Sequence, residues 1–174
     1  MELENLKYPV GRHQSKDNYS LIEVEAFIIT LRVFPSQLKA VVAHISEEQL
    51  NTPYRPEGWK VRQVIHHVAD SHMNAILRFK MALTEDNPTI KPYNEAAFAR
   101  LNDYELPIEP SLEIIENVHQ KWMFILSGMK PADFMKTYFH PQHQITFTLQ
   151  QALATYDWHC RHHLAHVNLV VGKF

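Results

Sequence analysis

The segment 159–166, which reads His-Cys-Arg-His-His-Leu-Ala-His, places four histidines within eight residues. On a helix, side chains four residues apart lie on one face, with their β-carbons roughly 5–6 Å apart. His159 would then lie beside His163, and His162 beside His166. Either pair could bind one divalent metal ion if a third ligand comes from elsewhere in the chain.

A third histidine is available far upstream, where residues 64–68 read Val-Ile-His-His-Val. A site with three histidines and no fourth protein ligand leaves a coordination position open for water, which distinguishes catalytic zinc from structural zinc. The helical motif His-Glu-x-x-His, which supplies its own general base, is absent. The spacing alone leaves both pairs in 159–166 open, and it does not choose between His66 and His67.

A polar stripe runs along the same predicted helix. Its members follow one another at spacings of three and four: Gln63, His67, Asp70, Ser71, Asn74 and Arg78. Such a stripe is either a solvated face or the wall of a cleft that leads to the metal. In a cleft, Arg78 would lie roughly 16 Å from His67 along the helix axis and would bind an anionic substrate group with its planar guanidinium. Asn74 would offer neutral hydrogen bonds nearer the metal, and Asp70 would accept the N–H of a ligand imidazole.

Long helices must position these residues. Apolar periodicity predicts four of them: about 19–33, continuing through 38–45 after a break or kink at Pro35; about 59–83; 110–126; and about 149–172. A short helix is predicted at about 95–101, residues 1–16 read as irregular, and the alternating segment 143–148 predicts a short hairpin or extended segment. We therefore predict an all-α four-helix bundle, with the metal site built between facing helices.

Composition limits the classes of partner. The 174 residues suffice for one domain, predicted to span 1–174, and 45% hydrophobic residues can form a sizeable core. A formal net charge of −2 gives no indication of a nucleic-acid or anionic-membrane partner. No apolar stretch approaches the roughly 20 residues that span a bilayer, and the N-terminus lacks the apolar region of a signal peptide. With one cysteine, Cys160, we expect a cytoplasmic protein.

The sequence resembles the DinB/YfiT-like superfamily, and within it the YfiT group of proteins assigned as metal-dependent hydrolases. The matching motifs span nearly the whole chain and lie at residues 8–11, 52–55, 58–74, 78–80, 91–93, 139–141 and 158–166. The departures are Lys60, where a small hydroxyl residue is common, and Cys160-Arg161 within the histidine run. Neither removes a ligand.

The resemblance implies a four-helix bundle with one divalent metal ion, zinc or nickel, bound by three histidines. The ligand positions of the family fall on His67, His159 and His163, which resolves the choice that the spacing left open. A homodimer is also a family expectation.

Three functions are compatible with these residues. The first is a metal-dependent hydrolase that acts on a small molecule. The second is a metal-dependent S-transferase, which would bind a low-molecular-weight thiol as thiolate and add it to an electrophile. A metal hydrolase usually has a carboxylate near the attacking water, and none lies next to the predicted ligands, so the chemistry favours the transferase whereas the family assignment favours the hydrolase. The third is a non-enzymatic bundle that binds a metal or a small ligand.

Overall fold

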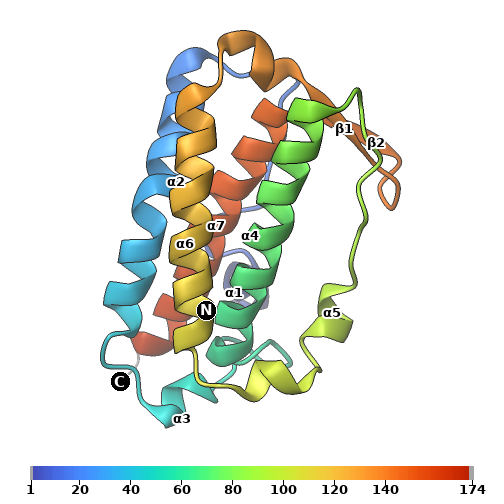
Figure 1. The fold of residues 1–174 in the computed structure, drawn as a ribbon. Helices are drawn as coiled ribbons and strands as arrows, with labels where there is room; N and C mark the ends of the chain where they lie inside the picture. Colours follow the sequence, from blue (N-terminus) through green and yellow to red (C-terminus); the bar gives the residue numbers. More distant parts are fainter. Residues whose placement is uncertain (1, 173–174) are drawn as a thin grey trace.

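Four long helices form a bundle, as the sequence predicts. The computed structural model describes residues 2–172, and the bundle helices are α2 (Leu21–Val42), α4 (Val61–Thr84), α6 (Glu109–Gly128) and α7 (Leu149–Val171). In Figure 1, α2 and α7 run in one direction, and α4 and α6 run in the other. Each helix packs on two neighbours: α2 and α4 both contact α6 and α7. The predicted metal ligands therefore lie on two adjacent antiparallel helices, α4 and α7.

The parallel orientation of α4 and α6 requires a long connection between them, because the chain must return to the end of the bundle from which α4 started. This connection contains α5 (Glu95–Phe98) and the 3-10 helix η1 (Asn102–Glu105), and it descends outside α4 (Figure 1). Its first part is held by the backbone of a hairpin strand, since Ile90 N–H donates to Phe139 O at 3.0 Å and Phe139 N–H donates to Pro88 O at 2.9 Å.

The hairpin consists of β1 (Thr137–His140) and β2 (Ile145–Thr148), which pair antiparallel with Thr137 opposite Thr148. It follows the 3-10 helix η2 (Pro131–Met135) and leads directly into α7. The short hairpin or extended segment predicted at 143–148 is confirmed for residues 145–148, which form β2, whereas residues 143–144 lie in the turn before it. Thr148 also caps α7, because its side chain accepts from Gln151 N–H and the Gln151 side chain reaches back to the backbone of Thr148.

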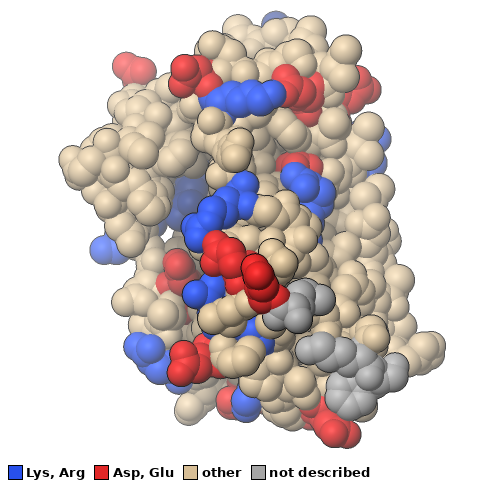
Figure 2. All heavy atoms as spheres, turned by 180° about the vertical axis from the view of Figure 1, so that it is seen from behind, with Lys and Arg blue, Asp and Glu red and all other residues tan. Residues whose placement is uncertain are grey.

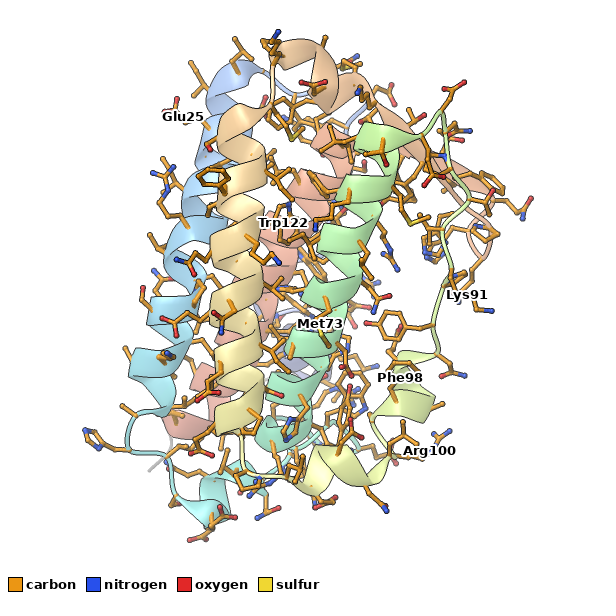
Figure 3. All side chains as sticks on the ribbon, in the orientation of Figure 1. Glu25, Met73, Lys91, Phe98, Arg100 and Trp122 are labelled. Carbon is orange, nitrogen blue, oxygen red and sulfur yellow. The ribbon has the colours of Figure 1, made fainter. Side chains whose placement is uncertain are left out.

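The core lies between the four helices and is dominated by large side chains such as Phe34, Phe79 and Trp122, each at most 1% exposed. Figure 3 shows Trp122 among the helices, whereas Glu25 points outward from α2. Apolar side chains inside the bundle and charged side chains outside it are what the apolar periodicity predicts.

Three local predictions differ from the structure. Residues 1–16 read as irregular, but Leu3–Lys7 form the short helix α1. A break or kink was expected at Pro35; the break does not occur, because α2 is one helix from Leu21 to Val42 with Pro35 inside it. Proline has no N–H for the carbonyl four residues earlier. That carbonyl, on Leu31, accepts a hydrogen bond from His119 Nδ1 at 2.6 Å instead, so the helix continues without leaving a buried acceptor unpaired. The short helix expected at 95–101 is also smaller than predicted, since α5 ends at Phe98.

The surface carries both signs of charge. In Figure 2 blue and red side chains are interspersed over the body, whereas the lobe at the upper left, which the hairpin forms, shows almost none. The hairpin residues 137–148 include no Lys, Arg, Asp or Glu.

No helix within residues 2–172 has both the length and the apolar character needed to cross a membrane.

Candidate metal centre

Three histidines from two helices come together at the α4–α7 interface. His67 on α4 and His159 and His163 on α7 each offer a ring nitrogen, and these nitrogens all lie within 4.8 Å of one another. His67 Nε2 lies 3.3 Å from His159 Nε2. Tetrahedral zinc with Zn–N distances of ~2.0–2.1 Å places ligand nitrogens ~3.3–3.4 Å apart. His67 Nδ1 is buried and has no hydrogen-bond partner within residues 2–172. The residues present therefore fit a divalent metal ion.

The electrostatics keep these imidazoles in the form that binds metals. Burial lowers the pKa of His67 to about 4. Burial, together with the neighbouring imidazoles, holds the pKa values of His159 and His163 well below the usual value for histidine. All three rings are therefore neutral at neutral pH, and neutral imidazole is a ligand for zinc, nickel, copper and iron.

The structure turns His66 away from this cluster. Its Nδ1 lies 2.7 Å from Ser111 Oγ, and its Nε2 lies 3.1 Å from Leu106 O. Both nitrogens of His66 are thus engaged on the α6 side of α4. Of the two neighbouring histidines, His67 is the one that faces α7.

The other pair in the 159–166 run lies beside the cluster. His162 stacks on Trp158 with ring centroids 4.1 Å apart, and His166 lies behind His163, with their Nδ1 atoms 3.4 Å apart. His162, His163 and His166 also bring ring nitrogens within 4.8 Å of one another. His166, however, already has Nδ1 beside His163 and Nε2 3.2 Å from Lys7 O. Both ring nitrogens of His166 therefore already have partners.

A cavity of about 490 Å³ opens onto the three histidines. Its walls come from α4, α7, the connection after α4, and the hairpin. Besides the three histidines, the lining residues are Trp59, Ser71, Arg78, Pro92, Tyr93, Glu95, His140, Gln142, His143, Thr155, Tyr156, Trp158 and His162. The polar stripe of α4 is thus a cavity wall at His67, Ser71 and Arg78.

The predicted substrate residues separate into two groups. Arg78 lines the cavity, with Nη1 3.5 Å from the Tyr156 hydroxyl and a buried Nε that has no partner within residues 2–172. Asn74 is not a lining residue, and its Nδ2 donates to the backbone oxygen of Asp70 at 2.9 Å. The Asp70 carboxylate accepts from the Tyr104 hydroxyl at 2.6 Å. In the described part of the chain, no hydrogen bond joins Asp70 to His67, His159 or His163.

Sequence reasoning did not identify the cavity wall that the hairpin forms, to which His140 and His143 contribute with ring centroids 4.3 Å apart. His140 is buried and its Nδ1 has no partner within residues 2–172. The motif at 139–141 was a signal, but spacing cannot reveal that the hairpin folds over α4. Tyr93, from the connection after α4, also lines the cavity and packs against Phe98, labelled in Figure 3, with ring centroids 5.0 Å apart.

A four-helix bundle with three neutral histidines clustered between two helices and lining a cavity defines a class of metal-binding bundle proteins. Residues 30–167 match the sequence profile described as the DinB superfamily. The chain belongs to the DinB superfamily and, within it, to the YfiT group.

Named relatives and a solved structure resemble nearly the whole chain. A protein of Bacillus pumilus (strain SAFR-032) named "Putative metal-dependent hydrolase" is 46% identical over 98% of each chain. A similarly named protein of Oceanobacillus iheyensis is 45% identical over 94% of each chain. The solved structure is described as "YfiT from Bacillus subtilis is a probable metal-dependent hydrolase with an unusual four-helix bundle topology". It superimposes with a TM-score of 0.93 at 38% identity and 97% coverage of each chain.

Proposed function

We propose that this protein is a metal-dependent hydrolase of a small molecule that carries an anionic group, with the metal held by His67, His159 and His163. The observation that carries the proposal is that this cluster lines a cavity that Arg78 also lines. A divalent metal held there would act as a Lewis acid, lowering the pKa of a water molecule and polarising a carbonyl or phosphoryl group. The relatives named as metal-dependent hydrolases support this reaction class.

The chain's own residues would bind and orient the substrate. Arg78 has a buried Nε without a partner within residues 2–172, and its Nη1 lies 3.5 Å from the Tyr156 hydroxyl. A planar guanidinium binds carboxylate or phosphate through paired hydrogen bonds. Trp59 packs against His67 with ring centroids 4.8 Å apart, and with Trp158 it supplies apolar surface that limits water access to the cluster. Asn74, which lies outside the cavity, is not part of the proposed substrate site.

One observation favours a second candidate, the S-transferase. Among the residues that the structure describes, Glu95 is the one carboxylate that lines the cavity, and it is exposed on α5. A hydrolase gains from a general base close to the attacking water. A transferase has less need of one, because a nearby metal lowers the pKa of the thiol itself.

Turnover measurements separate these reactions. The metal-loaded protein is assayed with a panel of esters and amides, and in parallel with monochlorobimane in the presence and absence of low-molecular-weight thiols. We expect ester or amide hydrolysis that needs no thiol and is lost in His163→Ala. Thiol-dependent conjugation that is lost in the same variant would replace the hydrolase by the transferase. No turnover in either assay by a metal-loaded protein would favour the non-enzymatic binding bundle. Zinc or nickel as the metal, a homodimer and a cytoplasmic location stay predictions.

A further inference from the structure

A chain of hydrogen bonds leads from His159 across the core of the bundle. His159 Nδ1 lies 3.1 Å from His72 Nε2, and His72 Nδ1 lies 2.7 Å from His119 Nε2. His119 Nδ1 lies 2.6 Å from Leu31 O. The side chains of His72 and His119 are 0% and 2% exposed. These four hydrogen-bonded residues lie on α7, α4, α6 and α2 in turn, so the hydrogen bonds link all four helices of the bundle.

The backbone end of this chain sets the direction of every hydrogen bond. Leu31 O can only accept, and it lacks the usual helical donor four residues later because Pro35 has no N–H. His119 Nδ1 must therefore carry the proton and donate. A neutral imidazole has one N–H and one acceptor nitrogen. His119 Nε2 is then an acceptor, His72 donates from Nδ1 and accepts at Nε2, and His159 donates from Nδ1. The only nitrogen of His159 left with a free lone pair is Nε2, which faces His67.

We propose that His72 and His119 are positioning residues of the metal centre: they fix His159 as the Nδ1–H tautomer, with its Nε2 lone pair directed at the metal. Partners that accept the second N–H of a ligand histidine set its ring orientation and raise its basicity. Here that acceptor is another histidine, anchored on a carbonyl that a proline leaves without a helical donor. The expected effect on metal affinity rests on the proposed function. The tautomers of the three rings exist with or without a bound metal.

The alternative for the same residues is a second metal site. His72, His119 and Cys160 bring possible ligand atoms within 4.8 Å of one another. The 2.7 Å between His72 Nδ1 and His119 Nε2 is a hydrogen-bond distance, shorter than the ~3.3 Å between nitrogens that share a tetrahedral ion. Both nitrogens of both rings already have partners. A hydrogen-bonded chain therefore accounts for the cluster better than a metal ion.

The other ligand on α7 follows the same pattern. His166 Nε2 lies 3.2 Å from Lys7 O, an acceptor at the end of α1. His166 Nδ1 then accepts from His163 Nδ1 at 3.4 Å, which leaves His163 Nε2 as its metal-binding nitrogen. Both ligands on α7 would thus be fixed through a second histidine and a backbone carbonyl.

Nuclear magnetic resonance of the metal-free protein tests the hydrogen-bond direction. Long-range proton–nitrogen correlations in ¹⁵N-labelled protein at neutral pH assign the tautomer of each ring. We expect the Nδ1–H tautomer for His72, His119 and His159. An Nε2–H tautomer at any of the three would overturn the proposal, whether or not the protein binds a metal.

Zinc affinity tests the positioning role. Wild type, His72→Leu and His72→Gln are compared by competition with a chromophoric chelator, and His66→Leu is the matched control because it removes another buried histidine from α4. We expect His72→Leu to bind zinc on the order of 10–100-fold more weakly. His72→Gln should recover most of the loss, because its amide can both accept and donate, and His66→Leu should not change the affinity of the folded protein.

Unchanged zinc affinity in folded His72→Leu would make His72 a merely structural residue. If His72→Leu does not fold, the zinc affinity of His72→Gln and the tautomers of the three rings decide whether His72 positions the metal centre. A second equivalent of zinc that is lost in His119→Leu would replace the hydrogen-bonded chain by a second metal site. Wild type that binds no zinc would refute the proposed function, while the tautomers would still decide whether the chain of histidines exists as described.

Discussion

His66 and His67 are neighbours in the sequence, but the helix rotates them by about 100° relative to each other. The imidazole of His66 is hydrogen-bonded between Ser111 and the Leu106 carbonyl. His67 faces His159 and keeps one buried nitrogen without a partner in the described chain. Identical side chains one position apart therefore have different roles, which the packing of α4 between α6 and α7 determines.

The same rotation explains why Asp70 and Asn74 do not line the cavity. A step of four residues turns a helix by about +40° relative to the starting side chain, and a step of three turns it by about −60°. Ser71 and Arg78 therefore lie to one side of His67, and Asp70 and Asn74 to the other. The sequence predicted a polar stripe correctly, but it could not show which edge of the stripe faces a cavity, because that depends on where the hairpin and the connection after α4 pack.

Arg78→Ala should raise KM by on the order of 10–100-fold, because hydrogen bonds to a charged group contribute about 1.5–3 kcal/mol. The metal content should stay at the wild-type value, since Arg78 is not among the clustered histidines. The measurement is steady-state kinetics with whichever substrate the turnover panel identifies, together with metal analysis. Lys80→Ala is the control, because Lys80 is exposed on the same helix. Equal KM values for the two variants would contradict a substrate role for Arg78.

At the scale of elements, the four long helices were predicted from the sequence, whereas α1 was missed and α5 was predicted too long. The four bundle helices have apolar stripes that are long enough to mark them in the sequence. Helices as short as α1 and α5 are not stable by themselves, so whether they form and where they end depends on tertiary contacts as well as on the local pattern. Pro35 misled the prediction for a related reason: its effect on α2 depends on His119, which lies 84 positions further along the chain and supplies the missing donor.

Thr148 is the residue where the hairpin ends and α7 begins. Thr148→Ala removes the side-chain cap that accepts from Gln151 N–H. We expect a loss of about 1 kcal/mol in the free energy of unfolding, measured by urea denaturation. Thr30→Ala is the control, because Thr30 lies in the middle of α2 and its hydroxyl bonds only the preceding turn of that helix. A loss no larger than that of the control would mean that the cap contributes nothing to the stability of α7.

At the scale of the whole molecule, the bundle buries an unusual number of neutral histidines. Burial lowers the pKa of His119 to about 4 and that of His166 to about 4, as it does for His67. Histidine in the unfolded chain has a pKa near 6.5. Between these values the unfolded chain binds protons that the folded protein does not, so stability falls as the pH falls. The full contribution is present above about pH 6.5 and is lost progressively towards pH 4.

The metal-free protein should therefore be much less stable at pH 5 than at pH 7.5. His119 alone should lower the free energy of unfolding by about 2 kcal/mol between pH 7.5 and pH 5, because one pKa unit corresponds to about 1.4 kcal/mol. Urea denaturation in the presence of a chelator measures the difference. His44→Ala serves as the control, because it removes a histidine that is exposed rather than buried. Equal stability at the two pH values would contradict the neutral state of the buried histidines.

The most direct test of the three-histidine site is zinc stoichiometry by equilibrium dialysis of His163→Ala and His162→Ala. Both variants remove a buried histidine from α7, one position apart. We predict one equivalent of zinc in wild type and in His162→Ala, and none in His163→Ala. His67→Ala and His159→Ala should behave like His163→Ala, and His66→Ala like wild type. Zinc retained by His163→Ala and lost by His162→Ala would contradict the assignment of the metal centre.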